Sequence, residues 1–210
     1  MADEDLMRAW DDLIGRHTTD PAAAETGRAL LACWAEPHRR YHSLGHLRDI
    51  LTHVEELADH ADDADAVRLA AWYHDAVYNG HPRDDEEHSA QRAEVDLAAL
   101  GLDPSLVAEV ARLVRLTLSH NPTSGDCNGE TLCDADLAVL GAEPRTYRAN
   151  SVAIREEYGH VPDGEFRARR ARVVRGLLSS PQVYHTPLAR SRWESRARAN
   201  LAAELRQLER

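Results

Sequence analysis

The sequence contains no lysine, because all 25 basic residues are arginine. A catalytic Schiff base and a Walker-type phosphate loop both need a lysine, so these two chemistries are excluded. No apolar run approaches the roughly 20 residues of a membrane-spanning helix, so no membrane partner is expected. The first ten residues, MADEDLMRAW, lack the basic and apolar regions of a signal peptide, and a cytoplasmic protein is therefore expected.

Cysteine is also scarce. The three cysteines, Cys33, Cys127 and Cys133, are odd in number, and their spacing matches no zinc or redox motif. A low cysteine content is typical of a reducing compartment. The sequence therefore predicts that they are packing residues or free thiols.

Acidic residues dominate the charge, and the chain of 210 residues has a formal net charge of −11. Such an acidic protein is a poor ligand for nucleic acid, so no nucleic-acid partner is expected. The last third differs, because residues 145–210 hold 14 arginines and seven acidic residues. These arginines either attract a phosphorylated small molecule or form the solvated faces of amphipathic helices.

Apolar residues recur at steps of three and four along most of the chain, for example between Leu44 and Leu57. This spacing is typical of amphipathic helices, and no segment alternates with the period of two of a strand. Caps, prolines and glycines divide the pattern into helices over residues 5–17, 20–35, 43–57, 65–78, 84–100, 103–120, 133–140, 144–158, 163–178 and 191–208. The sequence predicts an all-α fold in one domain, residues 1–210, with an arginine-rich helical extension at residues 145–210.

The segment LAAWYHDAVY, residues 69–78, places a His-Asp pair, His74 and Asp75, among apolar residues. A helix that is apolar all round is usually buried, so both side chains are expected inside the protein. A buried carboxylate without a cationic partner is strongly destabilising, so Asp75 needs such a partner. An arginine is one alternative and a metal ion is the other. His74 favours the metal, because an imidazole and a carboxylate are a common ligand pair.

Other candidate ligands lie before and after this pair. His42 and His46 are four residues apart in YHSLGH and share one helix face, although such a pair can also be a capping and a surface residue. Asp134 and Asp136 lie at the expected start of a helix, where carboxylates are favoured by the helix dipole. We assign Asp134 to capping and Asp136 to the site. The complete order is then His46, His74-Asp75 and Asp136.

Five motifs follow one another in the order of a known superfamily: HRRYHSLGHL, WYHDAVY, DDEEHSA, DADLAVLGA and IREEY. Together they resemble the HD-domain superfamily of metal-dependent phosphohydrolases, and more narrowly a bacterial family of predicted HD phosphohydrolases. The similarity extends from Pro37 to the C-terminus. It implies an HD-domain helical bundle that cleaves a small phosphate ester, with a phosphorylated metabolite or nucleotide as its partner. It also implies a metal bound by His46, His74, Asp75 and Asp136.

The motif YHSLGH is also similar to the YHNxxH of cyclic-nucleotide phosphodiesterases, although Ser43 replaces the asparagine. In those enzymes the second histidine binds metal and the first protonates the leaving group, which implies that His46 is a ligand and His42 a general acid. Two imidazoles and two carboxylates suit a divalent transition metal, namely Mn, Fe, Ni, Co or Zn, with Mg as a further candidate. Such an ion activates water, and Asp75 is expected to accept a proton from that water.

Further residues are candidates for contacts with the substrate. Glu86 in DDEEHSA either positions water or selects the substrate, or it belongs to a solvated acidic helix start. His120 either binds phosphate or a second metal, or it interacts with a helix dipole. Arg39, Arg155 and Tyr158 lie in the outer motifs, and arginine is the usual bidentate partner of phosphate. One of the two arginines is expected in the pocket, and a salt bridge is the alternative for Arg155.

Two other functions remain open at this point. A mixed-valent diiron oxygenase uses the same superfamily fold and needs additional histidine ligands, for which His81, His88 and His120 are available. A non-catalytic sensor of a metal or a nucleotide is the second alternative. Two irons per chain would indicate the oxygenase, and turnover of any phosphate ester would exclude the sensor.

Overall fold

The computed structural model describes residues 2–81 and 83–210, and this part of the chain contains ten α-helices and no strand. The all-α prediction is therefore confirmed. The helices are α1 (Ala2–Ile14), α2 (Ala23–Trp34), α3 (Leu44–Leu57), α4 (Ala64–Tyr73), α5 (Asp84–Ala99), α6 (Pro104–Leu116), α7 (Cys127–Asp136), α8 (Pro144–Glu157), α9 (Asp163–Ser179) and α10 (Pro187–Leu208). Two short 3₁₀ helices, η1 (Ala58–His60) and η2 (Leu137–Gly141), follow α3 and α7. None of the described helices is both long enough and apolar enough to cross a membrane.

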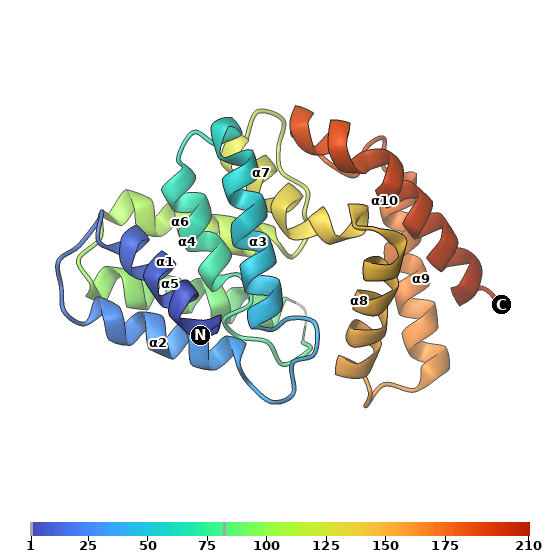
Figure 1. Ribbon diagram of the computed structural model, residues 1–210, viewed down its shortest axis with the longest axis horizontal. Helices are drawn as coiled ribbons and strands as arrows, with labels where there is room; N and C mark the ends of the chain where they lie inside the picture. The colour runs from blue at the N-terminus through green and yellow to red at the C-terminus, as the bar shows by residue number, and fades with distance from the viewer. Residues whose placement is uncertain (1, 82) are drawn as a thin grey trace.

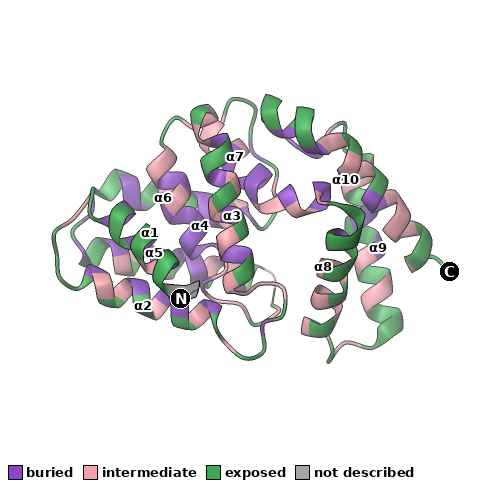
Figure 2. Ribbon diagram, in the orientation of Figure 1, coloured by how far each residue is buried: buried purple, intermediate pink, exposed green. Residues whose placement is uncertain are grey.

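Helix α4 lies at the centre of the first seven helices and is buried along most of its length (Figures 1 and 2). Helices α1, α3, α5, α6 and α7 pack against it. The ring of Trp72 packs edge-on against Trp10 with 5.3 Å between the ring centroids, and Trp34 Nε1 donates a 3.0 Å hydrogen bond to Trp72 O. Full burial of a large apolar side chain stabilises a fold by roughly 1.5–3 kcal/mol. The packing of these aromatic residues therefore makes the end of α4 rigid.

The His-Asp pair lies beyond the end of α4 and not inside a helix, contrary to the prediction. Helix α4 ends at Tyr73, His74 is its C-terminal cap and Asp75 follows in a turn. Side chains then supply hydrogen bonds that a further helical turn would have supplied. Arg39 Nη1 donates to Asp75 O at 2.8 Å, and Ser89 Oγ donates to Val77 O at 3.3 Å. An apolar pattern does not reveal such distant partners, so the expected helix was too long.

Helix α7 begins at Cys127 and not at Cys133, so the end of the predicted polar loop NPTSGDCNGE is helical. Asp126 is the N-cap, and its Oδ1 accepts a 2.9 Å hydrogen bond from Gly129 N. Arg112 of α6 also pairs with this carboxylate at 2.7 Å. The cap and the ion pair together outweigh the poor helix propensity of an Asn-Gly pair. As a result, Asp136 is the last residue of a helix and does not lie at a helix start.

Helices α8, α9 and α10 lie together beside the first seven helices (Figure 1). Glu204 of α10 joins all three, because its carboxylate accepts hydrogen bonds from Tyr147 Oη of α8 and, at 2.8 Å, from Arg170 Nε of α9. Asn200 Nδ2 donates to Leu140 O and Ala142 O at 2.9 Å each. These two bonds attach α10 to η2 and its following turn, and thereby to the end of α7.

Asp134 has a capping role, but at a different helix from the one expected. Its side chain is fully buried in the last turn of α7. The carboxylate accepts hydrogen bonds from His185 N at 2.8 Å and from Thr186 N at 2.7 Å, directly before α10. Burial raises the pKa of the Asp134 carboxyl, and these two backbone donors oppose that shift. Asp134 therefore fixes the start of α10 to α7.

We expect Asp134→Asn to lower the free energy of unfolding by about 1–3 kcal/mol, because the amide NH₂ would face a backbone donor and leave it unpaired. Urea denaturation followed by circular dichroism measures this difference. Asp59→Asn, at an exposed residue of η1, is the control and should change the free energy by less than about 0.5 kcal/mol. Equal effects of the two substitutions would contradict the role of Asp134.

Candidate metal centre

Three of the four predicted ligands, His74, Asp75 and Asp136, line a polar cavity of about 160 Å³ at the place where several helices end. Its walls come from the ends of α4, α6, α7 and α8, the start of α5 and the connection before α3. The lining residues are His42, His74, Asp75, Tyr78, Gly80, Asp85, Glu86, Thr117, His120, Asp136 and Tyr158. Helix ends have free backbone groups and irregular turns, so side chains distant in the sequence can converge there.

Two histidines and one aspartate form the centre of this region. His46, His74 and Asp136 each offer a donor atom, and the three atoms lie within 4.8 Å of one another. The two Nε2 atoms are 3.2 Å apart, and Asp136 Oδ1 lies 3.1 Å from His46 Nε2 and 3.7 Å from His74 Nε2. Metal–ligand bonds of about 2.0–2.2 Å place neighbouring donor atoms about 3–4 Å apart. The group can therefore hold a metal ion.

The ring of His74 is held in the tautomer that a metal ligand requires. Its Nδ1 lies 2.9 Å from Ala71 O, so this nitrogen donates its hydrogen to the carbonyl group. Nε2 then directs its lone pair toward the ligand group. The ring of Trp34 packs against His74 and the ring of Tyr41 against His46, with 5.3 Å and 4.9 Å between centroids. Both imidazoles are buried, so their orientation is fixed by packing as well as by hydrogen bonding.

The facing atoms of this group are at hydrogen-bond distance, so either a proton on one of them or a metal ion between them must separate their electron pairs. Burial lowers the pKa of His74, but the carboxylates of Asp75 and Asp136 raise it more, to a net value of about 9. Burial raises the pKa of both aspartates, and the imidazoles around them, His74 first, bring each value well below its ordinary range. The region therefore attracts positive charge, which a proton or a metal ion can supply.

Asp75 stands beside the three-residue group. Its Oδ2 lies 3.2 Å from His74 Nε2 and 4.0 Å from His46 Nε2. The side chain is only partly buried and lines the cavity. The structure thus brings three of the four ligands predicted from the sequence into one group and places the fourth next to it.

His120 contacts the second oxygen of Asp136. Its Nε2 lies 2.7 Å from Asp136 Oδ2, while Oδ1 faces the two ligand histidines. Helix α6 ends at Leu116, and His120 lies beyond it with a φ of +48°. This left-handed conformation is uncommon for residues other than glycine. The imidazole lines the cavity, and its contact with Asp136 orients that carboxylate.

His42 lines the cavity without belonging to the ligand group. Its Nδ1 lies 2.7 Å from Glu157 Oε2, and its ring stacks on Tyr78 with 4.3 Å between centroids. Glu157 Oε1 also accepts hydrogen bonds from the backbone N–H groups of Arg40, Tyr41 and His42, at 2.7, 2.8 and 2.9 Å. Burial raises the pKa of the Glu157 carboxyl, but His42 and these donors bring it to about 2. The end of α8 therefore holds His42 in place.

Arg39 lies behind the cavity and does not line it. The side chain is fully buried between two aromatic rings. Its guanidinium pairs with Glu36 at 3.0 Å and donates to the carbonyl oxygens of His42, Asp75 and Ala76. All five N–H groups are engaged in this way, so the predicted contact with a substrate phosphate is not open to Arg39. It instead ties the loop of His42 to the turn of Asp75.

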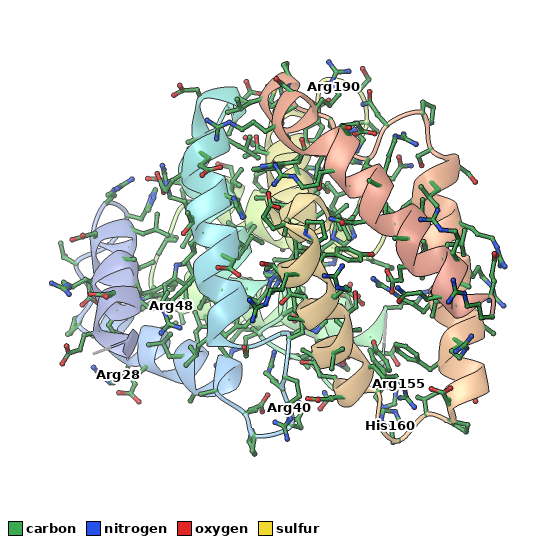
Figure 3. All side chains as sticks on the ribbon, turned by 45° about the vertical axis from the view of Figure 1, so that its right-hand side comes forward. Arg28, Arg40, Arg48, Arg155, His160 and Arg190 are labelled. Carbon is green, nitrogen blue, oxygen red and sulfur yellow. The ribbon has the colours of Figure 1, made fainter. Side chains whose placement is uncertain are left out.

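Arg155 is also outside the cavity. Figure 3 shows it with His160 near the turn that joins α8 and α9. Its guanidinium donates to Tyr158 O at 2.6 Å and to Val161 O at 3.1 Å, and it pairs with Asp163 at 3.4 Å. The salt-bridged alternative therefore describes Arg155. Neither arginine expected in the pocket is among the described residues that line it.

Glu86 and Tyr158, the other two candidates for substrate contacts, both line the cavity. Glu86 also accepts a hydrogen bond from the backbone N–H of Arg83, the N-cap residue of α5. The two interpretations of Glu86, a helix-start residue and a cavity residue, are thus compatible, because its side chain caps the start of α5 and also lines the cavity. Tyr158 follows α8 and reaches the cavity from the C-terminal helices.

Several residues of this region were not identified from the sequence, among them Glu157, Asp85 and Tyr41. Glu157 holds the loop of His42, as described above. Asp85 accepts hydrogen bonds from Asn79 N at 2.9 Å and His81 N at 2.7 Å, and thereby shapes the loop that closes the cavity. Tyr41 packs on His46, and burial together with Asp136 raises its pKa well above the ordinary value, so its hydroxyl stays neutral. All three lie inside the motifs quoted from the sequence, and this position was the one sequence signal that could have identified them.

Comparisons with protein-family models, with curated proteins and with solved structures found no match for this chain. The resemblance to the HD-domain superfamily therefore stays a prediction. The functional argument depends on the residues and distances given above.

We expect a divalent ion to raise the thermal stability of the protein, because the ligand group forms only in the folded chain. An ion at about 100 times its Kd stabilises the fold by about 2.7 kcal/mol. His74→Ala should remove both this shift in Tm and the bound metal, as measured by thermal denaturation and elemental analysis with Mn²⁺ and Zn²⁺.

His60→Ala is the matched control, because His60 is a partly buried histidine that contacts a carboxylate, Glu130, at 2.7 Å outside this group. This variant should keep the full metal-dependent shift. A His74→Ala protein that binds the ion as the wild type does would contradict the assignment.

Proposed function

We propose that this protein is a metal-dependent phosphohydrolase of the HD type that cleaves a small phosphate ester, with a nucleotide as the favoured substrate. The observation that carries the proposal is the group of His46, His74 and Asp136 at a polar cavity, with Asp75 and His42 beside it. The order of these residues along the chain is that of the superfamily which the motifs resemble.

A divalent ion held by His46, His74 and Asp136, with Asp75 as a fourth ligand, supplies a Lewis acid that activates water and polarises a phosphoryl oxygen. The cavity depends on that charge to accept an anion. Its lining contains the carboxylates of Asp75, Asp85, Glu86 and Asp136, and no arginine among the described residues. These carboxylates repel a phosphate group. Affinity for a phosphate ester is therefore expected to depend on the divalent ion.

Asp75 is placed in the cavity wall, where it can accept a proton from the attacking water, and the imidazoles that keep it ionised also make it a weaker base. Its pKa lies well below the ordinary range: burial raises it, but the neighbouring imidazoles, His74 first, lower it more. The carboxyl group is therefore ionised at neutral pH. Its position in the cavity wall makes it accessible to a water molecule there.

His42 is suited to donate a proton to the leaving oxygen. Its Nδ1 is engaged by Glu157, so Nε2 remains for the cavity. The cavity itself is smaller than the roughly 300–1,000 Å³ of most ligand sites, so a phosphoryl group fits it better than a whole nucleotide does.

The diiron oxygenase remains the second candidate because of one contact. His120 Nε2 lies 2.7 Å from the second oxygen of Asp136, so one extra imidazole stands next to the ligand group. The two other histidines available for a second iron, His81 and His88, are exposed and do not line the cavity. The structure therefore offers this chemistry only one of its three candidate ligands.

We expect hydrolysis of phosphate monoesters that is lost on chelation and restored by a divalent transition metal. Asp75→Asn and Asp136→Asn should each lower kcat/KM by at least about 100-fold, because they remove charge that holds the ion or accepts the proton. Asp59→Asn is the control. Undiminished turnover by protein that elemental analysis shows to be free of metal would refute a metal-dependent mechanism.

His42→Ala should affect substrates according to their leaving groups. General acid catalysis contributes about 10²–10⁴-fold when the departing oxygen needs a proton, as in an alkyl or ribose ester. An activated ester such as p-nitrophenyl phosphate needs little protonation, so its hydrolysis should fall much less. His88→Ala, at an exposed histidine of α5, should change neither rate. Equal losses on both esters with the metal retained would make His42 a phosphate-binding residue, and loss of the metal would make it a ligand.

A further inference from the structure

A second cavity adjoins the polar one. Its volume is about 310 Å³, and its walls come mainly from α8, α9 and the turn between them. His42, Gly80 and Tyr158 line both cavities, so the two share a boundary. The remaining lining residues are Ile154, Val161, Phe166, Arg169, Arg170 and Val173. The combined space reaches the size range of small-molecule sites, which begins at about 300 Å³.

The chemistry of the second cavity is opposite to that of the first. The described residues that line it include no carboxylate, and most of them are aliphatic or aromatic. Its two arginines are already paired, Arg170 with Glu204 at 2.8 Å and Arg169 with Glu165. The Arg170–Glu204 pair is mostly buried, whereas the Arg169–Glu165 pair lies at the surface. Because both guanidinium groups are paired and most of the lining is aliphatic or aromatic, the cavity is suited to an uncharged, apolar group.

Aromatic rings face this cavity from two elements. Phe166, the single phenylalanine of the chain, lies on α9, and Tyr158 follows α8. Their ring centroids are 5.9 Å apart, with 42° between the ring planes. Arg155 covers Phe166 at 4.8 Å from the ring centroid, which fixes the ring from one side. Rigid aromatic walls of this kind favour a flat ring as the ligand, because bases stack on aromatic side chains.

Gly80 keeps the boundary between the cavities open. Its φ of +74° favours glycine, and a Cβ atom added there would lie 3.8 Å from Tyr158 Cε1. Any larger side chain would extend into the space between Gly80 and Tyr158. The absence of a side chain thus leaves room for one molecule to occupy both cavities.

We propose that the second cavity binds the aromatic base of a nucleoside monophosphate whose phosphate lies in the polar cavity beside the candidate metal ligands. This inference rests on the proposed function and adds the part of the substrate that sets specificity. The phosphate would lie beside His46, His74 and Asp136, which would hold the ion, and Phe166, Tyr158 and the aliphatic residues of α8 and α9 contact the base.

The test compares ribose 5-phosphate with the 5′-monophosphates of adenosine, guanosine, cytidine and uridine. All five esters release the same kind of primary alkoxide, so a difference in kcat/KM reports the base. At least one nucleotide should be preferred over ribose 5-phosphate by about ten-fold or more, which is within the range that stacking of one base provides. If wild-type protein hydrolyses ribose 5-phosphate as well as every nucleotide, the inference fails while the proposed function stands.

Two matched variants locate the base. Val173 on α9 lines the second cavity, whereas Val152 on α8 lines a different one. Both are exposed, at 54% and 57%, so a tryptophan is tolerated at either position without disturbing the core. Val173→Trp should lower kcat/KM for the preferred nucleotide to about the level of ribose 5-phosphate and leave ribose 5-phosphate within about two-fold. Val152→Trp should change neither, and equal losses in both variants would overturn the inference.

Calorimetry with the four free nucleosides distinguishes a failure of the proposed hydrolase function from a failure of the base-binding inference. Nucleosides lack the phosphate, so their binding needs neither the metal nor turnover. If no ester is hydrolysed with Mn, Fe, Ni, Co, Zn or Mg, the proposed function fails. The cavity is then supported by nucleoside binding that is present in wild type and Val152→Trp and absent in Val173→Trp. Nucleoside binding that Val173→Trp leaves unchanged, or no binding at all, would count against the cavity.

Discussion

Buried carboxylates fix the irregular segments of this protein, because an ionised carboxylate removed from water requires hydrogen-bond donors. Asp134, Glu157 and Asp85 each find such donors on the backbone of a connecting segment, at residues 185–186, 40–42 and 79–81. These segments lie outside the helices and lack a regular hydrogen-bond ladder of their own. Two of the three segments contribute His42 and Gly80 to the wall of the polar cavity beside the candidate metal ligands. The cavity is thus shaped by carboxylate–backbone contacts as much as by apolar packing.

The carboxylates of the candidate ligand group also need donors, but they find them on imidazoles. Asp75 and Asp136 face imidazoles and not backbone N–H groups, and the imidazole of His74 already donates its Nδ1 hydrogen to Ala71 O. The remaining electron pairs converge, so a proton or a divalent ion between them offsets the desolvation of the carboxylates. The donors stand on α3, on the end of α4 and on the end of α7. A metal ion bound there would therefore link three central helices, which would couple metal affinity to the stability of the fold.

The sequence predicted most of this arrangement where the determining contacts are local. The all-α fold and the segments at Leu44–Leu57 and Pro144–Glu157 follow from periodicity, caps and proline positions. The three histidine and aspartate ligands followed from residue order and from the resemblance. The predicted helix boundaries were wrong where side chains distant in the sequence decide where a helix begins or ends. Arg39 ends the His-Asp helix through contacts 36 and 37 residues away along the chain, and Arg112 supports the early start of α7. Arg39 resembled a phosphate ligand because no sequence pattern shows that its five donors are already engaged.

The arginine-rich extension contributes to the cavity through shape and not through excess charge. Many of its arginines pair with acids of the same extension, as in Arg170–Glu204, Arg175–Glu209 and Arg198–Glu194. These pairs favour the interpretation of solvated, partly paired helix faces over attraction of a phosphorylated molecule, although arginines still outnumber acidic residues in the extension. The residues of the extension that line the two cavities near the metal centre are largely aromatic and aliphatic. An anionic substrate would then depend on the metal for its charge and on α8 and α9 for its fit. If the proposed function holds, substitutions on those two helices would change specificity while every candidate metal ligand stays in place.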